Sequence, residues 1–198
     1  MKLVRQFLKH EPPLDHLFAT CRDPNSASDL TTLQEQHPKS LHIIRLEVTD
    51  WDKHAEVADE VEKIVGAENG LNLLINNAGV LLNLKALDEI TPDTMLDAYK
   101  TNCVAPIFLT RAFLPLLKTA ASKADKAMRI HGGCVVEMST VVGSIAENER
   151  GGSYSYRCSK TALNMGMKNL SLGVEKDGIL MLAMHSVRFK QTWVVPTH

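Results

Sequence analysis

Tyr156 and Lys160 stand four residues apart in the segment YRCSK, and this pair is the strongest chemical signal in the sequence. If the segment is helical, both side chains lie on one face, so the lysine ammonium can sit near the phenol and favour its ionised form. Such a phenol can act as a general acid near neutral pH. Because many surface helices contain the same spacing, the polar residues elsewhere in the chain must decide whether the pair forms a site.

Three further polar groups could take part in the same chemistry. Ser139, Thr140 and Ser144 supply hydroxyls just after an apolar run. The segment 76–79, Asn-Asn-Ala-Gly, combines polar side chains with small residues that let a ligand approach the backbone. Asn102 lies in a helical pattern, where a polar side chain can bind backbone or water. Each group also has a plain structural interpretation, as turn caps, as a turn or as a buried amide, but four such groups in this order favour a site.

Short apolar runs alternate with helical patterns along the chain. We predict strands at residues 17–21, 41–48, 71–75, 134–138 and 179–184. We predict helices at 1–9, 25–36, 50–65, 91–117 and 156–174, the fourth interrupted at Pro106 and Pro115. Nearly continuous apolar strands between helices indicate a doubly wound α/β fold of three layers, with a parallel sheet covered on both faces. Ligands bind beyond the carboxyl ends of such strands, which is where the polar groups fall.

The composition limits the class of protein. The 198 residues are 44% hydrophobic and 23% charged, which suits a single globular domain over 1–198. With 22 Lys+Arg and 23 Asp+Glu the net charge is -1, so we expect no nucleic-acid or membrane partner. The apolar runs are shorter than the ~18 residues that a membrane span needs, and residues 1–10 lack the apolar centre of a secretory signal.

Four cysteines lie far apart in the sequence, with no CxxC pair among them: Cys21, Cys103, Cys134 and Cys158. Several have apolar neighbours, as small buried hydrophobic residues do. We therefore predict free thiols in a reducing compartment, a cytoplasmic location and no metal site.

Taken together, these motifs resemble the short-chain dehydrogenase/reductase family, and within it the small carbonyl reductases of the sniffer-like and C-factor-like branch. The resemblance runs over nearly all of residues 1–185. It implies a Rossmann-like domain with an NADP-dependent oxidoreductase activity, which reduces a carbonyl or oxidises an alcohol of a small molecule by hydride transfer. NAD is the less favoured cofactor.

The resemblance also implies roles for the residues named above. Tyr156 would protonate the carbonyl oxygen or deprotonate the alcohol, and Lys160 would lower the pKa of Tyr156 and hold the nicotinamide ribose. Asn102 would hold a water molecule that relays protons. Thr140 stands where the family has its catalytic serine, with Ser139 and Ser144 as substitutes.

The implied cofactor contacts lie at the ends of three strands. Asn77, Ala78 and Gly79 would line the cofactor. Glu47 and Val48 fall where the family places two residues against the adenine.

Arg22, at the end of the first predicted strand, suits a ribose 2′-phosphate and so favours NADP. Its alternative interpretation is a surface cation that pairs with Asp23.

The sequence departs from the family pattern at both ends. The family opens with a strand and a glycine-rich turn, whereas the first glycine here is Gly66, and the family pattern stops after His185, leaving a divergent tail at 186–198. We therefore expect an incomplete domain without the first strand and the C-terminal lid, and weak NADPH binding or none. The alternatives are a catalytically silent isoform, which dimerises with a full-length paralogue through the helices carrying Asn102 and Tyr156, and an incomplete gene prediction.

Overall fold

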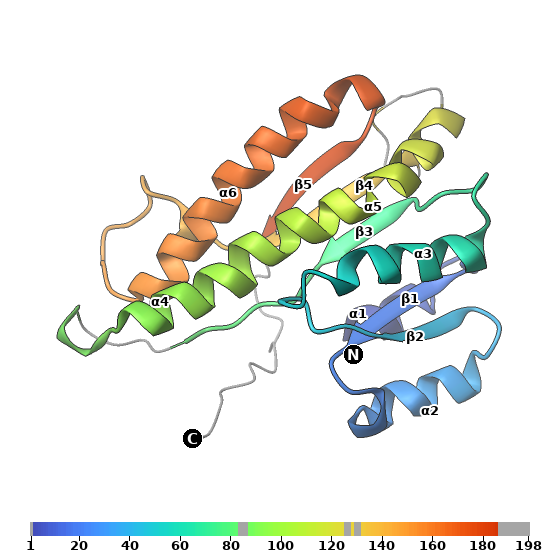
Figure 1. The fold of residues 1–198 in the computed structure, drawn as a ribbon, viewed down its shortest axis with the longest axis horizontal. Coiled ribbons are helices and arrows are strands. Elements are labelled where there is room, and N and C mark those ends of the chain that lie inside the picture. Colours follow the sequence, from blue (N-terminus) through green and yellow to red (C-terminus); the bar gives the residue numbers. More distant parts are fainter. Residues whose placement is uncertain (1, 83–86, 125–127, 129–131, 186–198) are drawn as a thin grey trace. The chain divides into compact units, whose positions relative to one another are not determined.

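The computed structural model describes residues 2–82, 87–124, 128 and 132–185, and the chain divides into two compact units, Met1–Val65 and Gly66–His198. All five predicted strands are present, and each pairs in parallel with its neighbour (Figure 1). They form two sheets, of order β1-β2 in the first unit and β3-β4-β5 in the second. The parallel α/β class is confirmed, and the predicted tail at 186–198 lies outside the described residues.

The first unit is built on a pair of parallel strands. Its elements are α1 (Lys2–Phe7), β1 (Leu17–Cys21), the 3-10 helix η1 (Pro24–Ser26), α2 (Ser28–Gln36), β2 (Leu41–Arg45) and α3 (Lys53–Val65). A buried cluster of Ala19, Leu30, Leu33 and Leu41 joins the strands to α2, and Val4 packs against it from α1. The predicted N-terminal amphipathic helix is therefore a packed helix, stabilised by the apolar area that it buries.

Several boundaries in this unit differ from the prediction, and those around residues 45–53 differ for a reason that the structure shows. β2 ends at Arg45 and not at residue 48, and α3 begins at Lys53 and not at residue 50. Between them the chain turns, since the Asp50 N–H donates to the Glu47 carbonyl at 2.9 Å. The apolar pattern at 46–48 therefore belongs to a turn that keeps Leu46 buried, which periodicity alone does not separate from a strand.

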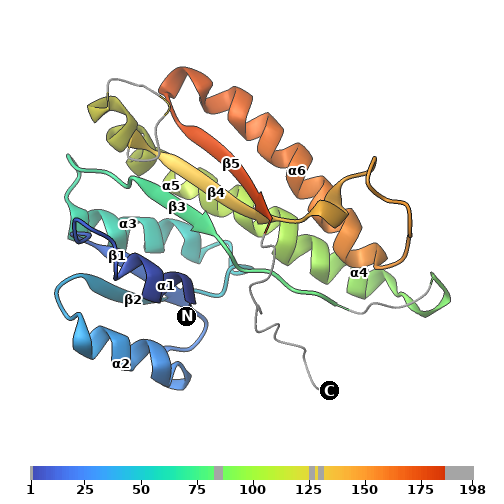
Figure 2. The same ribbon diagram turned by 180° about the vertical axis from the view of Figure 1, so that it is seen from behind.

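The second unit contains the three-stranded sheet and the longer helices. Its elements are β3 (Leu73–Asn76), η2 (Leu87–Glu89), α4 (Pro92–Tyr99), η3 (Lys100–Val104), α5 (Ala105–Lys123), β4 (Cys134–Ser139), η5 (Val141–Gly143), α6 (Tyr154–Val174), η6 (Glu175–Asp177) and β5 (Leu180–His185). In Figure 1 α5 and α6 lie in front of the sheet, and Figure 2 shows the strands in front of both helices. Both helices thus cover the same face, and β4 is the central strand.

The helix that follows β3 is continuous where a break was predicted. Pro115 lies inside α5, and Pro106 lies in its first turn. The irregularity is η3, a π-helical segment over Lys100–Val104. Each of the two prolines lacks a backbone N–H and so removes one donor from the helix, but neither ends it. The prediction of breaks at both prolines is therefore wrong, and the wide turn precedes Pro106.

The stretch Pro92–Lys123 is also long and apolar enough, by length and composition alone, to cross a membrane. Half of its most apolar window is buried inside the protein, as is typical of a core helix. The expectation that no segment reaches the length of a membrane span is corrected, because it counted uninterrupted apolar runs and overlooked a helix with scattered polar residues.

Gly70 offers a test of the packing between α5 and the turn that leads into β3. Its φ is +74°, and a Cβ there would lie 2.4 Å from the Leu116 carbonyl oxygen and 2.6 Å from the Ala120 nitrogen. Gly151 has a similar φ of +64° with nothing within 4 Å of a Cβ. We expect Gly151→Ala to cost about 1 kcal/mol for its left-handed backbone, and Gly70→Ala roughly 2 kcal/mol more, because backbone must move. Urea unfolding measures both, and equal losses would contradict the packing.

Candidate active site

Lys160 is a buried cation at the end of the central strand. It lies on α6, and its side chain is 4% exposed. The ammonium Nζ donates a hydrogen bond to the Met138 carbonyl oxygen at 2.7 Å. Burial lowers the pKa of Lys160 to about 8, against the opposing effect of the nearby Glu137 and Cys103. The ammonium therefore sits where its charge is costly and where small changes in its surroundings alter its protonation.

Tyr156 lies one turn before Lys160 on α6 and is 9% exposed. Burial raises the pKa of its phenol, and a hydrogen bond with the Thr140 side chain acts in the opposite direction. The Lys160 ammonium bonds to the Met138 carbonyl, and its predicted lowering of the Tyr156 pKa stays a prediction. The phenol therefore remains protonated at neutral pH.

The structure separates the three candidate hydroxyls. Thr140 bonds to Tyr156 and also caps the short helix η5 by accepting from the Val142 N–H. Ser139 Oγ donates instead to Asn164 Oδ1 at 2.6 Å, and Ser144 Oγ accepts from a loop N–H. Of the three hydroxyls, the one bonded to the phenol is therefore that of Thr140.

Asn102 is fully buried in the π-helical turn and binds two other segments. Its Oδ1 accepts from the Val80 N–H at 2.8 Å, and its Nδ2 donates to the Val80 carbonyl at 2.9 Å and to Ser159 Oγ at 3.0 Å. Both side-chain N–H groups are thus engaged. The predicted role in holding a water molecule stays a prediction, and the side-chain amide donors are used for structure.

The segment 76–79 divides into a structural part and an open part. Asn76 is buried, and its Nδ2 donates to Glu137 Oε1 at 2.6 Å and to Thr110 Oγ1 at 2.9 Å. Asn77 and Ala78 are exposed. A Cβ on Gly79 would lie 3.2 Å from Asn102 Oδ1 and 3.8 Å from Lys160 Nζ.

Small exposed residues beside a buried ammonium fit the ribose end of a nicotinamide cofactor. A side chain at Gly79 would fill the space against Asn102 and Lys160. The residues of this unit therefore fit that end of the cofactor, and their cofactor role remains a prediction.

The residues predicted to bind the adenosine end lie in the first unit. Arg22 follows β1 and is exposed, and the Asp23 side chain caps η1 by accepting from the Asn25 N–H. Arg45, which sequence reasoning missed, ends β2, and its Nε donates to the Arg22 carbonyl at 3.2 Å.

Two arginines, Arg22 and Arg45, therefore stand at the carboxyl ends of the paired strands β1 and β2, where the sequence predicted only Arg22. The register of β1 with β2 brings Cys21 opposite Arg45, and this pairing is the signal that would have found the second arginine. Glu47 is exposed beyond β2 and accepts from Thr49, while Val48 is half-buried.

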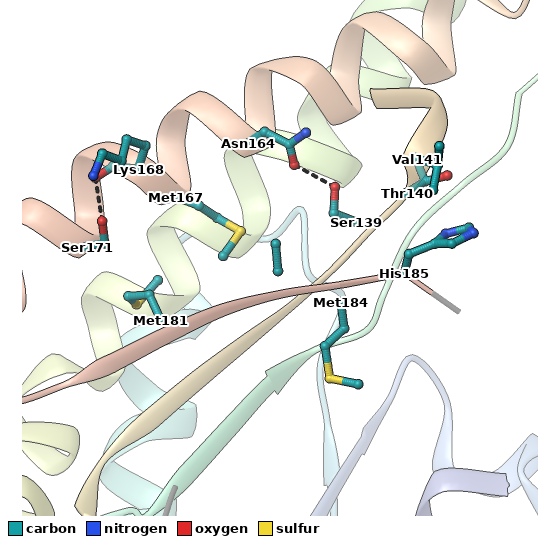
Figure 3. A pocket seen from close by; sticks show the side chains of 11 residues that line it. Ser139, Thr140, Val141, Asn164, Met167, Lys168, Ser171, Met181, Met184 and His185 are labelled. Carbon is teal, nitrogen blue, oxygen red and sulfur yellow. Dashed lines mark hydrogen bonds between the residues drawn. The ribbon is translucent and has the colours of Figure 1, made fainter. Parts of the chain in front are cut away.

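In the second unit a cavity of about 450 Å³ opens beside Ser139 and Thr140, between β5 and α6. Figure 3 shows Ser139 and Asn164 joined by their hydrogen bond at its wall, with Met167 and Met181 nearby. Its lining includes Thr140 but not Tyr156, Lys160 or Asn102. The cavity therefore adjoins the candidate site without containing its acid, and we do not assign the substrate to it.

Known proteins are similar to this chain in sequence and in fold. The family model for short chain dehydrogenase matches residues 14–192. An uncharacterised oxidoreductase of Schizosaccharomyces pombe is 29% identical over 185 residues, which is 93% of this chain and 67% of that protein. Two others from the same yeast are matched over 61% of their length.

Two solved structures are similar. The carbonyl reductase Sniffer of Drosophila melanogaster has a TM-score of 0.89 and 35% identity, over 92% of this chain and 73% of that one. An NADPH-bound carbonyl reductase from chicken fatty liver has a TM-score of 0.85 and 38% identity, over 92% and 72%. The chain therefore belongs to the short-chain dehydrogenase/reductase family of oxidoreductases. Within that family it falls in the sniffer-like branch.

Asn102 gives a test of how this site is held together. Asn102→Ala removes three hydrogen bonds and leaves the polar backbone of Val80 without its partner, so we expect a loss of about 2 kcal/mol or more. Asn148, an exposed asparagine with a single bond to the Gly151 N–H, is the matched control, and Asn148→Ala should cost about 0.5 kcal/mol or less. Urea unfolding measures the free energy lost in each variant. A similar loss in both would contradict the conclusion that the Asn102 hydrogen bonds hold the site together.

Proposed function

We propose that the chain is an NADP-dependent carbonyl reductase, or alcohol dehydrogenase in reverse, with Tyr156 as its acid and base. The observation that carries this proposal is the buried phenol bonded to Thr140, one helical turn from the buried ammonium of Lys160. The similar proteins from fly and chicken are carbonyl reductases, and the chicken enzyme binds NADPH.

In the reductive direction Tyr156 donates the phenolic proton from Oη to the carbonyl oxygen of the substrate. Its raised pKa keeps that proton in place at neutral pH until negative charge develops on the oxygen. The Thr140 hydroxyl orients the phenol and can donate to the same oxygen. A bound nicotinamide supplies the hydride to the carbonyl carbon.

Lys160 and the loop after β3 hold the ribose in this proposal. The ammonium has three N–H groups, of which one donates to Met138, so two remain for ribose hydroxyls. The residues after β3 leave room for the cofactor beside Lys160, since none of Asn77, Ala78 and Gly79 carries a side chain larger than an amide. A charged donor of this kind also favours the approach of a polar substrate oxygen.

The water relay assigned to Asn102 is supported by its backbone rather than its side chain. Pro106, four residues further on, has no N–H, so the Asn102 carbonyl receives no α-helical hydrogen bond from that position. A carbonyl in a π-helical turn is a suitable water acceptor. We propose that this oxygen holds the relay water.

Arg22 and Arg45 form the 2′-phosphate site in this proposal, with Glu47 and Val48 near the adenine. Both guanidiniums are exposed at one strand edge and are joined through the Arg45 contact to the Arg22 carbonyl. Guanidinium groups bind phosphate with fixed geometry, so the pair favours NADP over NAD.

A second candidate function is that of a silent isoform which acts by association. Phe108 on α5 and Met165 and Leu172 on α6 are exposed apolar side chains, at 38%, 64% and 59%. Met165 and Leu172 are seven residues apart and share one face of α6. Folded protein without turnover, together with a dimer mass in light scattering, would favour this candidate over the enzyme.

We also propose a cytoplasmic location. Its support is that all four cysteines are free, with Cys103 and Cys134 buried as reduced thiols. Recovery of the protein in a secreted or membrane fraction would contradict it.

Replacing Tyr156 tests the acid. Tyr156→Phe removes one oxygen and should lower kcat for NADPH-dependent reduction of small aldehydes and ketones by about 10³-fold, since the proton donor is lost. Tyr154→Phe, on the same helix, is the matched control and should retain activity. The rate of NADPH consumption measures both variants, and equal activity in Tyr156→Phe and wild type would exclude this acid.

Replacing the two arginines tests the cofactor preference. Arg22→Ala and Arg45→Ala should each weaken NADPH binding about 10-fold or more while leaving NADH binding unchanged, because each removes a charged contact to the 2′-phosphate. Arg5→Ala, in the exposed face of α1, is the charge-matched control. Calorimetry with each nucleotide measures the change, and parallel losses for NADPH and NADH would contradict the assignment.

A further inference from the structure

Glu137 places a carboxyl group in the centre of the sheet. It lies on β4 and has no exposed surface. Its Oε1 accepts from Asn76 Nδ2 at 2.6 Å and from Thr110 Oγ1 at 3.3 Å. Its Oε2 is buried without a hydrogen-bond partner among the described residues. A buried carboxylate that accepts hydrogen bonds at only one of its oxygens needs a further source of stabilisation.

A buried positive charge on α6 interacts with this carboxyl. Lys160 interacts electrostatically with Glu137, and its Nζ bonds to the carbonyl of Met138, the next residue on the strand. The other titratable group is Cys103 in η3, which interacts with both. The remaining elements contribute neutral groups, Asn76 from β3, Thr110 from α5 and, in register on β5, Ala183.

Each of these two groups costs free energy to bury alone, and together they compensate each other in part. The second unit thus buries an acid on β4 and a base on α6, and the ammonium of the base bonds to the residue that follows the acid on β4. Neither the acid–base chemistry at Tyr156 nor the cofactor contacts proposed above make use of the carboxyl.

We propose that Glu137 is a positioning residue for Lys160, whose buried carboxylate keeps the ammonium charged at the end of β4, where the Met138 carbonyl binds it. Glu137 does not touch the substrate or the cofactor and acts through the charge that it supplies to Lys160. The inference rests on the proposed function only for its catalytic consequence, because the coupling between the two side chains is a property of the protein itself.

The titrations of the two groups support this coupling. Burial raises the pKa of Glu137 to about 7 and lowers the pKa of Lys160 to about 8, and each charge opposes the shift of the other. Both groups are therefore ionised together only in a narrow range near neutral pH. Without the carboxylate, the ammonium would lose its proton at a lower pH.

Glu137→Gln tests the coupling directly. Glutamine keeps the acceptor oxygen for Asn76 and Thr110 and removes the charge. With isotopically labelled lysine, NMR should show the Lys160 Nζ titration at a pH lower by about one unit, a tenfold change in proton affinity. Glu175→Gln, an exposed glutamate of the same unit, is the charge-matched control and should leave it unchanged. An unshifted Lys160 titration in Glu137→Gln overturns the proposal.

The reciprocal variant covers the case in which Glu137→Gln does not fold. Lys160→Met removes the ammonium, so the carboxyl resonance of Glu137 should titrate at a higher pH than in the wild type. An unchanged titration would overturn the coupling.

The pH dependence of the wild-type stability gives a second test of the buried acid. The pKa of Glu137 is about 7 folded against an ordinary 4.5, so the folded state binds this proton more tightly. This contribution to stability is complete below pH 4.5 and is lost as the pH rises through 7, raising the unfolding constant by up to about tenfold per pH unit. The dependence should be absent from Glu137→Gln, and its persistence there counts against the buried acid.

Turnover distinguishes the two proposals. If Lys160 serves the reaction, the alkaline limb of kcat/KM for NADPH-dependent reduction should move to lower pH in Glu137→Gln by the same amount as the NMR titration. A shifted titration with no turnover in any variant would sustain the coupling and reject the reductase. An unshifted titration in an active enzyme would reject the coupling and sustain the reductase.

Discussion

The second unit depends on one side-chain amide. Asn102 binds the peptide group of Val80 through both its oxygen and its nitrogen, as a neighbouring strand would, and reaches Ser159 on α6 with its second N–H. The loop that carries Gly79 and the helix that carries the phenol and the ammonium are therefore fixed to the same buried residue. No hydrophobic contact has this directionality, and the spacing between loop and helix follows from the length of an asparagine side chain.

The second unit also buries several other polar and charged side chains. Glu137, Asn76 and Thr110 form one buried network at the middle of the sheet, and Lys160 adds a charge beside it. Such networks are less stabilising than an apolar core of the same volume, but they require specific partners and so favour a single arrangement. The sheet interior thus sacrifices some stability for groups that titrate near neutral pH.

The sequence identified the strands and the polar groups well because both follow simple rules. β1 begins and ends where its apolar run does, and the groups after β3 and β4 were found since parallel strands present their carboxyl ends together. What it could not resolve depends on three-dimensional contacts. Thr140 was already preferred over Ser139 from the family resemblance, but the bond that engages Ser139 with Asn164 appears only in the structure, and Arg45 becomes a site candidate only through the register of β1 with β2.

Glu137 was missed for a related reason, and the effect of burial on the pKa of Tyr156 was not anticipated. A glutamate inside an apolar run looks like an outward-facing residue until its burial is known, and helical spacing says that two side chains share a face but not how much water they lose.

The π-helical turn has another consequence. It holds one more residue than an α-helical turn, so the residues before and after it are rotated relative to a regular helix by about 100°. Removing a single residue there would therefore redirect every side chain on one side of Asn102, and the length of that turn is under tighter constraint than its composition.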